Sequence, residues 1–286
     1  MILVTGATGH VGTHLLRLLT QRGAALRALA HSSSSRAKIE GQGVEAVEGD
    51  FDRPETLEQA MEGCDRVFLL SPPHPEQAVR EKAAIDAAGR LGVSHVVALS
   101  VTGAERESPS PFSRWHAEID DHLLASGLSS TILRPAGFMQ VHLFPVHTVT
   151  TQGAWYGMTG NGAHAYIDAE DVAAVAAEVL TTAGHTGEAY ELTGPEAITM
   201  PQAATQLSEV VGRHVRYIDM PADQFGTSLA DAGLPGWLVE AAVVLYRRIR
   251  DGHLATVTNV VQQVTGRAPR DYRRFAEANK PAFSRA

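Results

Sequence analysis

The chain has 286 residues, a length that fits one large α/β domain or a dinucleotide-binding domain with a smaller partner. Its 44% hydrophobic and 20% charged residues are ordinary for a globular protein, and a net charge of -8 without a Lys/Arg block argues against a nucleic-acid partner. Cys64 is the single cysteine, which excludes a disulfide within the chain. No basic and apolar leader begins the chain and no apolar run approaches ~20 residues, so we expect a cytoplasmic protein without a membrane span.

The first half of the chain alternates short apolar runs with helical periodicity. Strands are expected at residues 2–4, 26–30, 44–47, 67–70, 95–99 and 130–133. Helices are expected from Val11 onward and at residues 56–61, 76–91 and 114–125. Strand–helix alternation with short connections predicts parallel strands and right-handed crossovers, which is a Rossmann-type, doubly wound α/β sheet.

The pattern changes after Pro135. Residues 153–162 are rich in Gly and aromatics and are interpreted as a loop or hairpin, and residues 165–167 as a strand that returns to the sheet. Further elements are expected as a helix at 170–180 capped by Asp168, strands at 190–192 and 215–217, and helices at 201–211, 238–248, 256–266 and 271–279. The sequence thus predicts a dinucleotide-binding domain over 1–135, completed by about 163–182. Residues 136–162 and 183–286 are expected to form a small α+β substrate-binding lobe.

A glycine-rich loop directly follows the first expected strand. Its sequence, Thr5-Gly6-Ala7-Thr8-Gly9-His10-Val11-Gly12, has a G-x-x-G-x-x-G spacing and leads into the first helix. Gly6 permits a tight turn, Gly9 lets backbone N–H groups approach a pyrophosphate, and Gly12 lets the helix pack closely on the strand. A bare glycine pattern is weak, but its place between a strand and a helix predicts a dinucleotide-binding site.

The end of the second strand bears on the choice of cofactor. NAD-binding sites usually have an acid there for the ribose 2′-hydroxyl, whereas this chain has His31 and Ser32 and no acid before Glu40. His31, the serine hydroxyls, Arg36 and Lys38 are groups that can hold a 2′-phosphate. NADP(H) is therefore the expected cofactor, with NAD(H) as the alternative if the serines form an exposed loop and Arg36 is merely solvated.

These features together resemble the NmrA-like group of atypical short-chain dehydrogenases/reductases, and the resemblance covers almost the whole chain. It is carried by the glycine loop and by Gly49-Asp50-Phe51-Asp52, Phe68-Leu69-Leu70-Ser71, Leu99-Ser100, Ser126-Gly127-Leu128 and Thr131-Ile132-Leu133-Arg134-Pro135. The resemblance implies that Asp50 and Phe51 flank the adenine. It also implies that Leu70, Ser71 and Pro72 line the ribose, and that Pro135 to Phe138 lie near the nicotinamide.

Two of the three catalytic residues usual in that family, the tyrosine and the lysine, are missing here. The family usually reduces carbonyls with Ser/Thr, Tyr and Lys in a Tyr-x-x-x-Lys spacing, where the phenol donates a proton. Counting back from Ser126-Gly127 places Phe112 at the Tyr position and His116 at the Lys position. An alternative register places Ser110 and Arg114 there, which also lacks the pair. Thr102 matches the usual Ser/Thr position, and Ser100 just before it is assigned to the cofactor site.

This departure resembles family members that reduce quinones, azo dyes or triphenylmethane dyes, and atypical ketoreductases of aromatic compounds. We therefore expect an NADPH-dependent reductase that moves hydride to a quinone or aromatic ketone, including polyketide-derived ones, with a small aromatic substrate as its partner. His116 either donates a proton or only orients the nicotinamide ribose. The alternative function is a non-catalytic, NADP-sensing regulator, and the chain is expected to be a monomer or homodimer.

Other polar residues give weaker signals. Thirteen histidines include no H-E-x-x-H spacing, so no metal site is expected, and no G-x-S-x-G motif supports a hydrolase. The acids between His116 and His122 are interpreted as a solvated helix face. Phe138, Met139, Phe144, Trp155, Tyr156 and Tyr166 are expected near the sheet edge, either as core or as walls of an aromatic substrate pocket.

Overall fold

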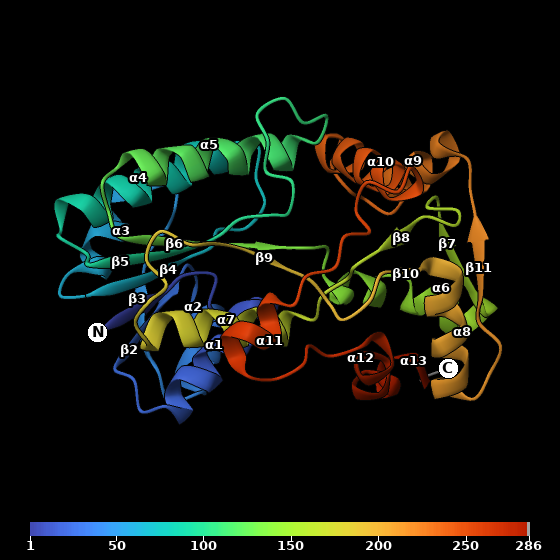
Figure 1. Cartoon of the computed structure of the whole chain (residues 1–286), viewed down its shortest axis with the longest axis horizontal. Coiled ribbons are helices and arrows are strands. Elements are labelled where there is room, and N and C mark those ends of the chain that lie inside the picture. Colours follow the sequence, from blue (N-terminus) through green and yellow to red (C-terminus); the bar gives the residue numbers. More distant parts are fainter. Residues whose placement is uncertain (285–286) are drawn as a thin grey trace.

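A parallel sheet of seven strands forms the larger half of the molecule. The computed structural model describes residues 1–284. The strands are β1 (Ile2–Val4), β2 (Leu26–Ala30), β3 (Glu45–Glu48), β4 (Arg66–Leu69), β5 (His95–Leu99), β6 (Ser130–Pro135) and β9 (Ala189–Leu192). Their order is β3-β2-β1-β4-β5-β6-β9, so the direction of winding reverses between β1 and β4 (Figure 1). The predicted doubly wound sheet is confirmed, and six of its strands lie within two residues of their predicted ends.

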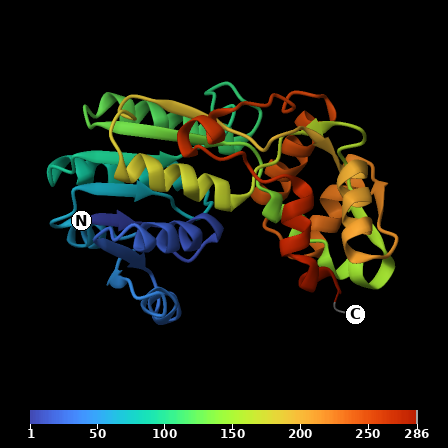
Figure 2. The same cartoon turned by 60° about the horizontal axis from the view of Figure 1, so that its bottom comes forward.

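Helices cover both faces of this sheet (Figures 1 and 2). One face carries α1 (His10–Gln21), α2 (Ser33–Glu40), α7 (Ala169–Thr181) and α11 (Val260–Thr265). The other face carries α3 (Pro54–Met61), α4 (Gln77–Arg90) and α5 (Pro111–Ala125). The central strands β1 and β5 are buried along their whole length because helices cover both faces of the sheet, whereas the edge strands β3 and β9 are partly exposed.

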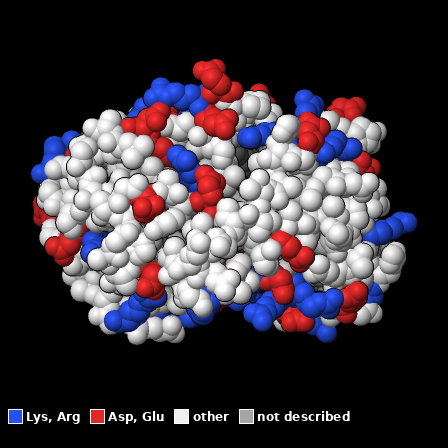
Figure 3. Space-filling view, viewed as in Figure 1, with Lys and Arg blue, Asp and Glu red and all other residues white. Residues whose placement is uncertain are grey.

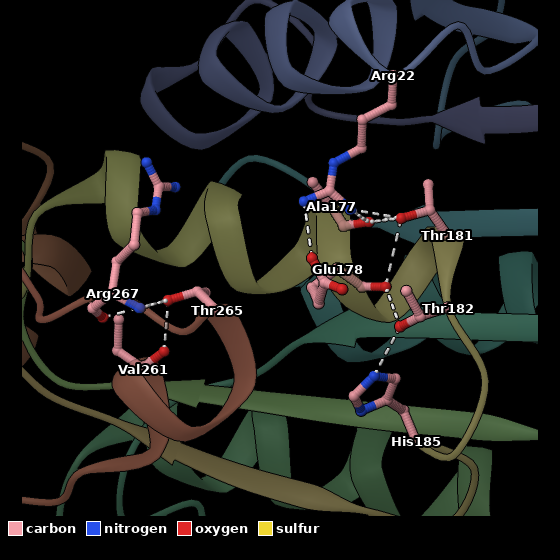
Figure 4. Close-up of polar contacts among 9 residues, drawn as sticks. All are labelled: Arg22, Ala177, Glu178, Thr181, Thr182, His185, Val261, Thr265 and Arg267. Carbon is pink, nitrogen blue, oxygen red and sulfur yellow. Dashed lines mark hydrogen bonds and ion pairs between the residues drawn. The ribbon is translucent and has the colours of Figure 1, made fainter.

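Polar contacts fix the ends of α1 and α7 against each other (Figure 4). The Arg22 guanidinium donates to the carbonyl of Ala177, to the hydroxyl of Thr181 and to the carboxylate of Glu178 at 2.7 Å. Beyond α7 the hydroxyl of Thr182 lies 3.0 Å from Nε2 of His185. The Arg22 contacts join α1, which connects β1 to β2, with α7, which precedes β9. They therefore hold the first and last crossover helices of the sheet together.

The seventh strand is β9, and not the segment at 165–167. That prediction was wrong, although both segments are apolar. Ile167 donates its N–H to Gly137 and accepts from Met139, so its backbone bonds go to the chain that leaves β6. The strand at 189–192 instead pairs in parallel with β6, from Ile132↔Ala189 to Pro135↔Leu192, after α7 has carried the chain back along the sheet.

The smaller lobe contains the remaining elements. These are a 3₁₀ turn (Met139–Leu143), α6 (Val146–Gln152), β7 (Ala154–Gly157), β8 (Ala163–His164), β10 (Ile198–Thr199), α8 (Met200–Val211), β11 (Arg216–Asp219), α9 (Ala222–Asp231), α10 (Gly236–Arg250), α12 (Tyr272–Ala278) and α13 (Lys280–Ser284). Residues 153–162 were expected to form a loop or hairpin: 158–162 are a loop, but 154–157 form β7, which pairs in parallel with β11 and makes no hairpin. Because the partner strand β11 comes only after α8, no turn sequence next to β7 indicates this pairing.

The serine-rich segment after β2 begins a helix and is not an exposed loop. Ser32 caps α2: its hydroxyl accepts from the N–H of Ser35, and the hydroxyl of Ser35 accepts from the N–H of Ser32. Such a reciprocal capping box satisfies two N–H groups that the first turn leaves free. On the face shown in Figure 3, Lys/Arg and Asp/Glu side chains are interspersed. Among residues 1–284, no helix is long and apolar enough to span a membrane.

His142 is a buried histidine in the core of the lobe. Its ring lies edge-to-face with Trp155, Tyr166 and Tyr272, at centroid distances of 4.8, 4.4 and 5.2 Å. Neither ring nitrogen has a hydrogen-bond partner among residues 1–284. Burial lowers the pKa of His142 to about 3, so the folded chain keeps this imidazole neutral down to acid pH.

This histidine makes the lobe acid-sensitive. The unfolded chain protonates His142 near its ordinary pKa of 6.5 and the folded chain does not, so the free energy of unfolding decreases as pH falls below 6.5. We expect His142→Phe to remove about 2 kcal/mol of the decrease between pH 8 and pH 5. Urea unfolding at pH 8 and at pH 5 measures the free energy of unfolding of each variant. Any change in stability from packing Phe in place of His is the same at both pH values, so it cancels in the difference. Equal pH dependence in His142→Phe and in His147→Phe, an exposed-histidine control on α6, would contradict this account.

Candidate active site

The glycine loop lies between β1 and α1, at the point where the sheet reverses its winding. Gly6 has φ +60°, and a Cβ there would lie 2.9 Å from Cγ of Leu70. A Cβ on Gly12 would lie 2.2 Å from the carbonyl oxygen of Gly6, so no side chain fits where α1 approaches the loop. Gly9 is the N-cap of α1 and offers no side-chain cap. The first backbone N–H groups of α1 are therefore left for an anion.

Thr5 fixes the loop to the neighbouring strand. Its hydroxyl lies 3.0 Å from the carbonyl of Phe68 and 2.9 Å from that of Leu70, and it accepts from the N–H of Leu70 at 2.8 Å. Thr5 is fully buried, so these bonds form away from water. The loop that follows β1 and the segment that follows β4 are therefore held as one rigid unit.

The residues predicted to bind the cofactor follow the carboxyl ends of successive strands. Thr8, His10 and Val11 follow β1; His31, Ser32 and Arg36 follow β2; Asp50 and Phe51 follow β3; Leu70, Ser71 and Pro72 follow β4; Ser100 follows β5; Pro135 ends β6 and Phe138 comes after it. Since all strands are parallel, these ends meet at one edge of the sheet, where open α/β sheets bind ligands. The structure thus brings the predicted set to a single edge.

Arg36 stands on the first turn of α2. Its guanidinium donates to the carbonyl of Ala46 on β3 at 2.7 Å and lies 3.5 Å from the carboxylate of Glu40. The side chain stays 43% exposed, and its partner Ala46 is level with Ala28 in the middle of β2, two residues before the strand ends. The hydroxyl of Ser32 is engaged as the α2 cap, so of the predicted phosphate ligands this one already has a partner.

A buried polar cluster connects the end of β4 with α4 and α5. Oε1 of Glu81 accepts from the hydroxyl of Ser71 at 2.6 Å, from its N–H at 3.2 Å and from Nε2 of Gln77 at 3.1 Å. The same Gln77 nitrogen lies 3.3 Å from Nε2 of His116. All four side chains are less than 9% exposed. We call Ser71, Gln77, Glu81 and His116 the α4–α5 cluster.

Burial shifts the two titratable groups of this cluster in opposite senses. It lowers the pKa of His116 to about 4, because nothing nearby offsets the loss of water. It raises the pKa of Glu81 to about 7, against the opposing effect of the bonds from Ser71 and Gln77. At neutral pH His116 is therefore a neutral imidazole that offers a hydrogen bond, whereas Glu81 titrates there.

A second buried group lies one turn further along α5. Oδ2 of Asp120 accepts from the hydroxyl of Ser100 at 3.0 Å and from the Arg134 guanidinium at 2.9 Å. The expected solvated acidic face on this helix was therefore wrong for Asp120, although Glu118 and Asp121 are exposed. Asp120 follows His116 by four residues, so both lie on the helix face that packs on the sheet.

Thr102 lies between two strand ends. Its hydroxyl is 3.0 Å from the carbonyl of Arg134 and 2.9 Å from Oε2 of Glu191. A hydroxyl has one proton, which these two acceptors occupy, so Thr102 keeps its lone pairs for any further partner. Burial raises the pKa of Glu191 from its ordinary value.

Aromatic side chains from both halves of the molecule meet at the start of α5. Phe112, at the predicted tyrosine position, is edge-to-face with Trp115 at 5.5 Å and with Trp237 of α10 at 6.0 Å. The two tryptophan rings are 5.8 Å apart, and all three side chains are partly exposed. Figure 1 shows α10 next to one terminus of α5, which agrees with a contact at the start of that helix. The pair Phe112 and His116 provides neither a phenol nor an ammonium group.

Comparisons with known proteins agree with this geometry. A family model described as NAD(P)H-binding matches residues 6–183. The chain is 36% identical over 286 residues to the NAD(P)H azoreductase of Xenophilus azovorans, with 100% of each covered. It is 37% identical to the (4-alkanoyl-5-oxo-2,5-dihydrofuran-3-yl)methyl phosphate reductase of Streptomyces griseus, with 99% of each covered. The NADPH complex of an Escherichia coli NADPH-dependent quinone oxidoreductase superposes with a TM-score of 0.89 at 26% identity, covering 97% of this chain and 99% of that one.

This chain belongs to the NmrA-like atypical short-chain dehydrogenases/reductases. It is an NAD(P)H-dependent oxidoreductase, and the predicted family is confirmed. The loop also fits such a cofactor, since a Cβ at Gly12 would overlap backbone and the start of α1 carries no side-chain cap. Within the described residues, no group of three or more His, Cys, Asp or Glu side chains is placed to hold a metal ion.

Glu81 and Gln77 of the α4–α5 cluster were not predicted from the sequence. Glu81 and Gln77 fall in an amphipathic helix, where acidic and amide side chains are usually interpreted as solvent-facing. Their four-residue spacing, which repeats in His116 and Asp120, was the available signal of a shared buried face. Six large side chains were expected near the sheet edge as core or as pocket walls. Met139, Trp155 and Tyr166 are lobe core and Phe138 packs partly buried on the sheet core, whereas Phe144 is 86% and Tyr156 39% exposed.

Proposed function

We propose that this chain is an NADPH-dependent reductase that transfers hydride to a quinone or to an electron-poor aromatic ketone or azo compound, without a Tyr–Lys pair. The observation that carries the proposal is the replacement of that pair by Phe112 and the buried, neutral His116 beside an aromatic cluster. Relatives named as an azoreductase and a quinone oxidoreductase support the same substrate class.

Each group of residues has a distinct task in this proposal. When bound, NADPH supplies the hydride. The loop Gly6 to Gly12 and the start of α1 hold its pyrophosphate, while Asp50, Phe51, Leu70 and Pro72 line its adenosine half. Phe112, Trp115 and Trp237 offer apolar faces to a flat substrate, and their geometry orients it.

His116 is the proposed polar partner of the substrate oxygen. A quinone or conjugated acceptor delocalises the charge that hydride transfer creates, so it needs a weaker acid than a simple ketone does. The neutral His116 imidazole can stabilise that charge with an N–H hydrogen bond. Thr102 is proposed as a second polar residue at the same edge; because its proton is already donated to Arg134 or Glu191, it would accept a hydrogen bond there and not stabilise the negative charge.

The cofactor preference gives a direct test of Arg36. We expect Arg36→Glu to weaken NADPH binding by about 10-fold or more and to leave NADH binding nearly unchanged, because only NADPH carries the 2′-phosphate. Fluorescence titration of both cofactors measures the ratio. Arg216→Glu on β11 is the matched charge control and is expected to change neither affinity. Parallel loss of NADPH and NADH affinity would show that Arg36 does not read the 2′-phosphate.

The substrate class is tested with purified protein and a panel of quinones, azo dyes and polycyclic aromatic ketones. We expect NADPH consumption with at least one quinone or azo compound, and none with simple aliphatic ketones, which need a stronger acid. Equal activity on aliphatic ketones would show that the site contains a strong acid and that the proposal is wrong.

A further inference from the structure

Arg248 of α10 is a partly buried cation to which the chain supplies no anion. Nη1 of its guanidinium donates to the hydroxyl of Ser108 at 3.4 Å, and no carboxylate among residues 1–284 pairs with it. Within the same residues, every other partly buried Arg or Lys has either a carboxylate within 3.5 Å (Arg27, Arg36, Arg80, Lys82, Arg134 and Arg270) or two backbone carbonyls (Arg66 and Arg213). A guanidinium has five N–H donors, so most of those of Arg248 remain for a ligand.

The Arg248 guanidinium lies beside the edge of the sheet where the site was described. A Cβ on Gly103 would lie 3.4 Å from Nη2 of Arg248, so the guanidinium faces bare backbone there. The preceding residue, Thr102, donates its N–H to the carbonyl of Pro135 at 3.0 Å. Pro135 begins the segment that we expect near the nicotinamide. One residue and one hydrogen bond therefore separate the guanidinium contact from that segment.

Arg248 shares a face of α10 with Trp237. The two residues are eleven positions apart, which places them about 20° from each other around a helix of 3.6 residues per turn. Trp237 contacts Phe112 and Trp115 at the start of α5, whereas Arg248 contacts the β5–α5 loop, residues 100–110, just before it. One face of a lobe helix thus presents an aromatic ring and a cation to the same edge of the sheet.

We propose that Arg248 binds an oxyanion on the aromatic substrate, so that the enzyme prefers acceptors with a carboxylate, sulfonate or phosphate group. The proposal rests on the reductase function proposed above and narrows its substrate class. A guanidinium binds oxyanions through paired, charge-assisted N–H bonds, and the Trp237 ring suits the aromatic part of the same molecule. Arg248 is a specificity-determining residue in this account and takes no part in hydride or proton transfer.

The neighbouring charges are consistent with this role. Glu105 and Glu107 of the β5–α5 loop are exposed, and neither pairs with Arg248. A cation in the last turn of α10 also stabilises the helix, since the C-terminal end of a helix carries a partial negative charge. That effect applies equally to Arg247, which is exposed. It does not explain why Arg248 is turned toward Gly103 and left without a carboxylate.

Two quinones that differ by one charged group test the proposal. Naphthoquinone is neutral, and naphthoquinone sulfonate carries an oxyanion on the same ring system. We expect Arg248→Gln to lower the ratio of kcat/KM for the sulfonated over the plain quinone ~10- to 100-fold, because only the sulfonated one loses a charged partner. The quinones differ in intrinsic reactivity, but that difference is common to both proteins and cancels in the comparison. Arg247→Gln is the matched control and should leave the ratio unchanged.

Binding without turnover gives a second readout. Naphthalene sulfonate accepts no hydride, and naphthalene sulfonamide is its neutral counterpart. In the NADP⁺ complex of the wild type we expect calorimetry to show the sulfonate binding ~10-fold or more tightly than the sulfonamide. Arg248→Gln should bind the two alike, and Arg248→Lys should retain part of the preference because it keeps the charge but not the paired donors. Inorganic sulfate, which has no ring for Trp237, should compete weakly.

Equal wild-type affinity for the sulfonate and the sulfonamide would overturn the proposal, and this measurement needs no variant. So would an equal loss of kcat/KM for both quinones in Arg248→Gln, or a loss of NADPH affinity as large as the loss of sulfonate affinity. Sulfate that competes as strongly as the aryl sulfonate would also overturn it. A wild type that prefers the sulfonate but reduces neither quinone contradicts the reductase function and still supports the anion site, so the two failures are distinguishable.

Discussion

Gly9→Asp should abolish useful NADPH binding while leaving the fold intact. Gly9 is the N-cap of α1 in an extended conformation, with φ -79° and ψ 178°, and aspartate is among the most favourable N-cap residues. Its carboxylate would occupy the N–H groups that we assign to the pyrophosphate and would repel it. We expect the dissociation constant to rise about 100-fold or more, measured by fluorescence titration.

Gly9→Asn separates charge from bulk in this experiment. A Cβ at Gly9 would lie 3.3 Å from the carbonyl oxygen of Gly6, a tight contact that both variants share. The neutral amide should therefore weaken binding less than the carboxylate does. Thermal unfolding checks that both variants remain folded. Unchanged NADPH affinity in folded Gly9→Asp would remove the glycine loop from the cofactor site.

His116→Ala should lower turnover ~10- to 10³-fold on an active substrate, with the lower end expected if the imidazole only orients the reactants. The affinity for NADPH should fall less than turnover, because His116 acts on the reacting groups. Single-turnover measurement at saturating NADPH isolates this step. Wild-type rates in the variant would remove His116 from the mechanism.

Two further variants control for the helix. His122→Ala removes an imidazole that pairs with Asp86 on the outer side of α5, and it should retain the wild-type rate. Phe112→Tyr supplies a phenol but no lysine four residues later, so it should not restore the usual mechanism of the family. A large gain of ketone reduction in Phe112→Tyr would show that the phenol alone suffices.

Local sequence patterns were sufficient to predict six of the seven strands of the sheet. The strand at 95–99 and the glycine loop between the first strand and the first helix are each determined by residues close together in the sequence, and the structure confirms both elements. The serines after β2 were interpreted as possible 2′-phosphate ligands, with an exposed loop as the alternative, and the capping box by which Ser32 and Ser35 begin α2 was not predicted. The pairing of β9 with β6 joins residues more than fifty positions apart in the sequence, such as Ile132 and Ala189, and no local sequence pattern indicates it.

The site was predictable only where a backbone feature marks it. The glycines of the loop could be recognised in the sequence because a side chain at Gly6 or Gly12 would overlap neighbouring atoms, so only glycine fits there. The α4–α5 cluster depends instead on which face of two helices is buried, and a glutamate or glutamine in a helix gives no sign of that. Trp237 reaches Phe112 from α10, more than a hundred residues away, so their contact follows from the packing of the lobe.

Anaerobic single-turnover reduction of a quinone tests the central claim most directly. Stoichiometric NADPH, quinone and purified protein are mixed, and the loss of NADPH and the formation of quinol are followed together. We expect one quinol for each NADPH consumed in the wild type, and neither change in Gly9→Asp. Firm NADPH binding without quinol formation, repeated across the azo dyes and aromatic ketones of the panel, would contradict the account and favour an NADP-sensing regulator.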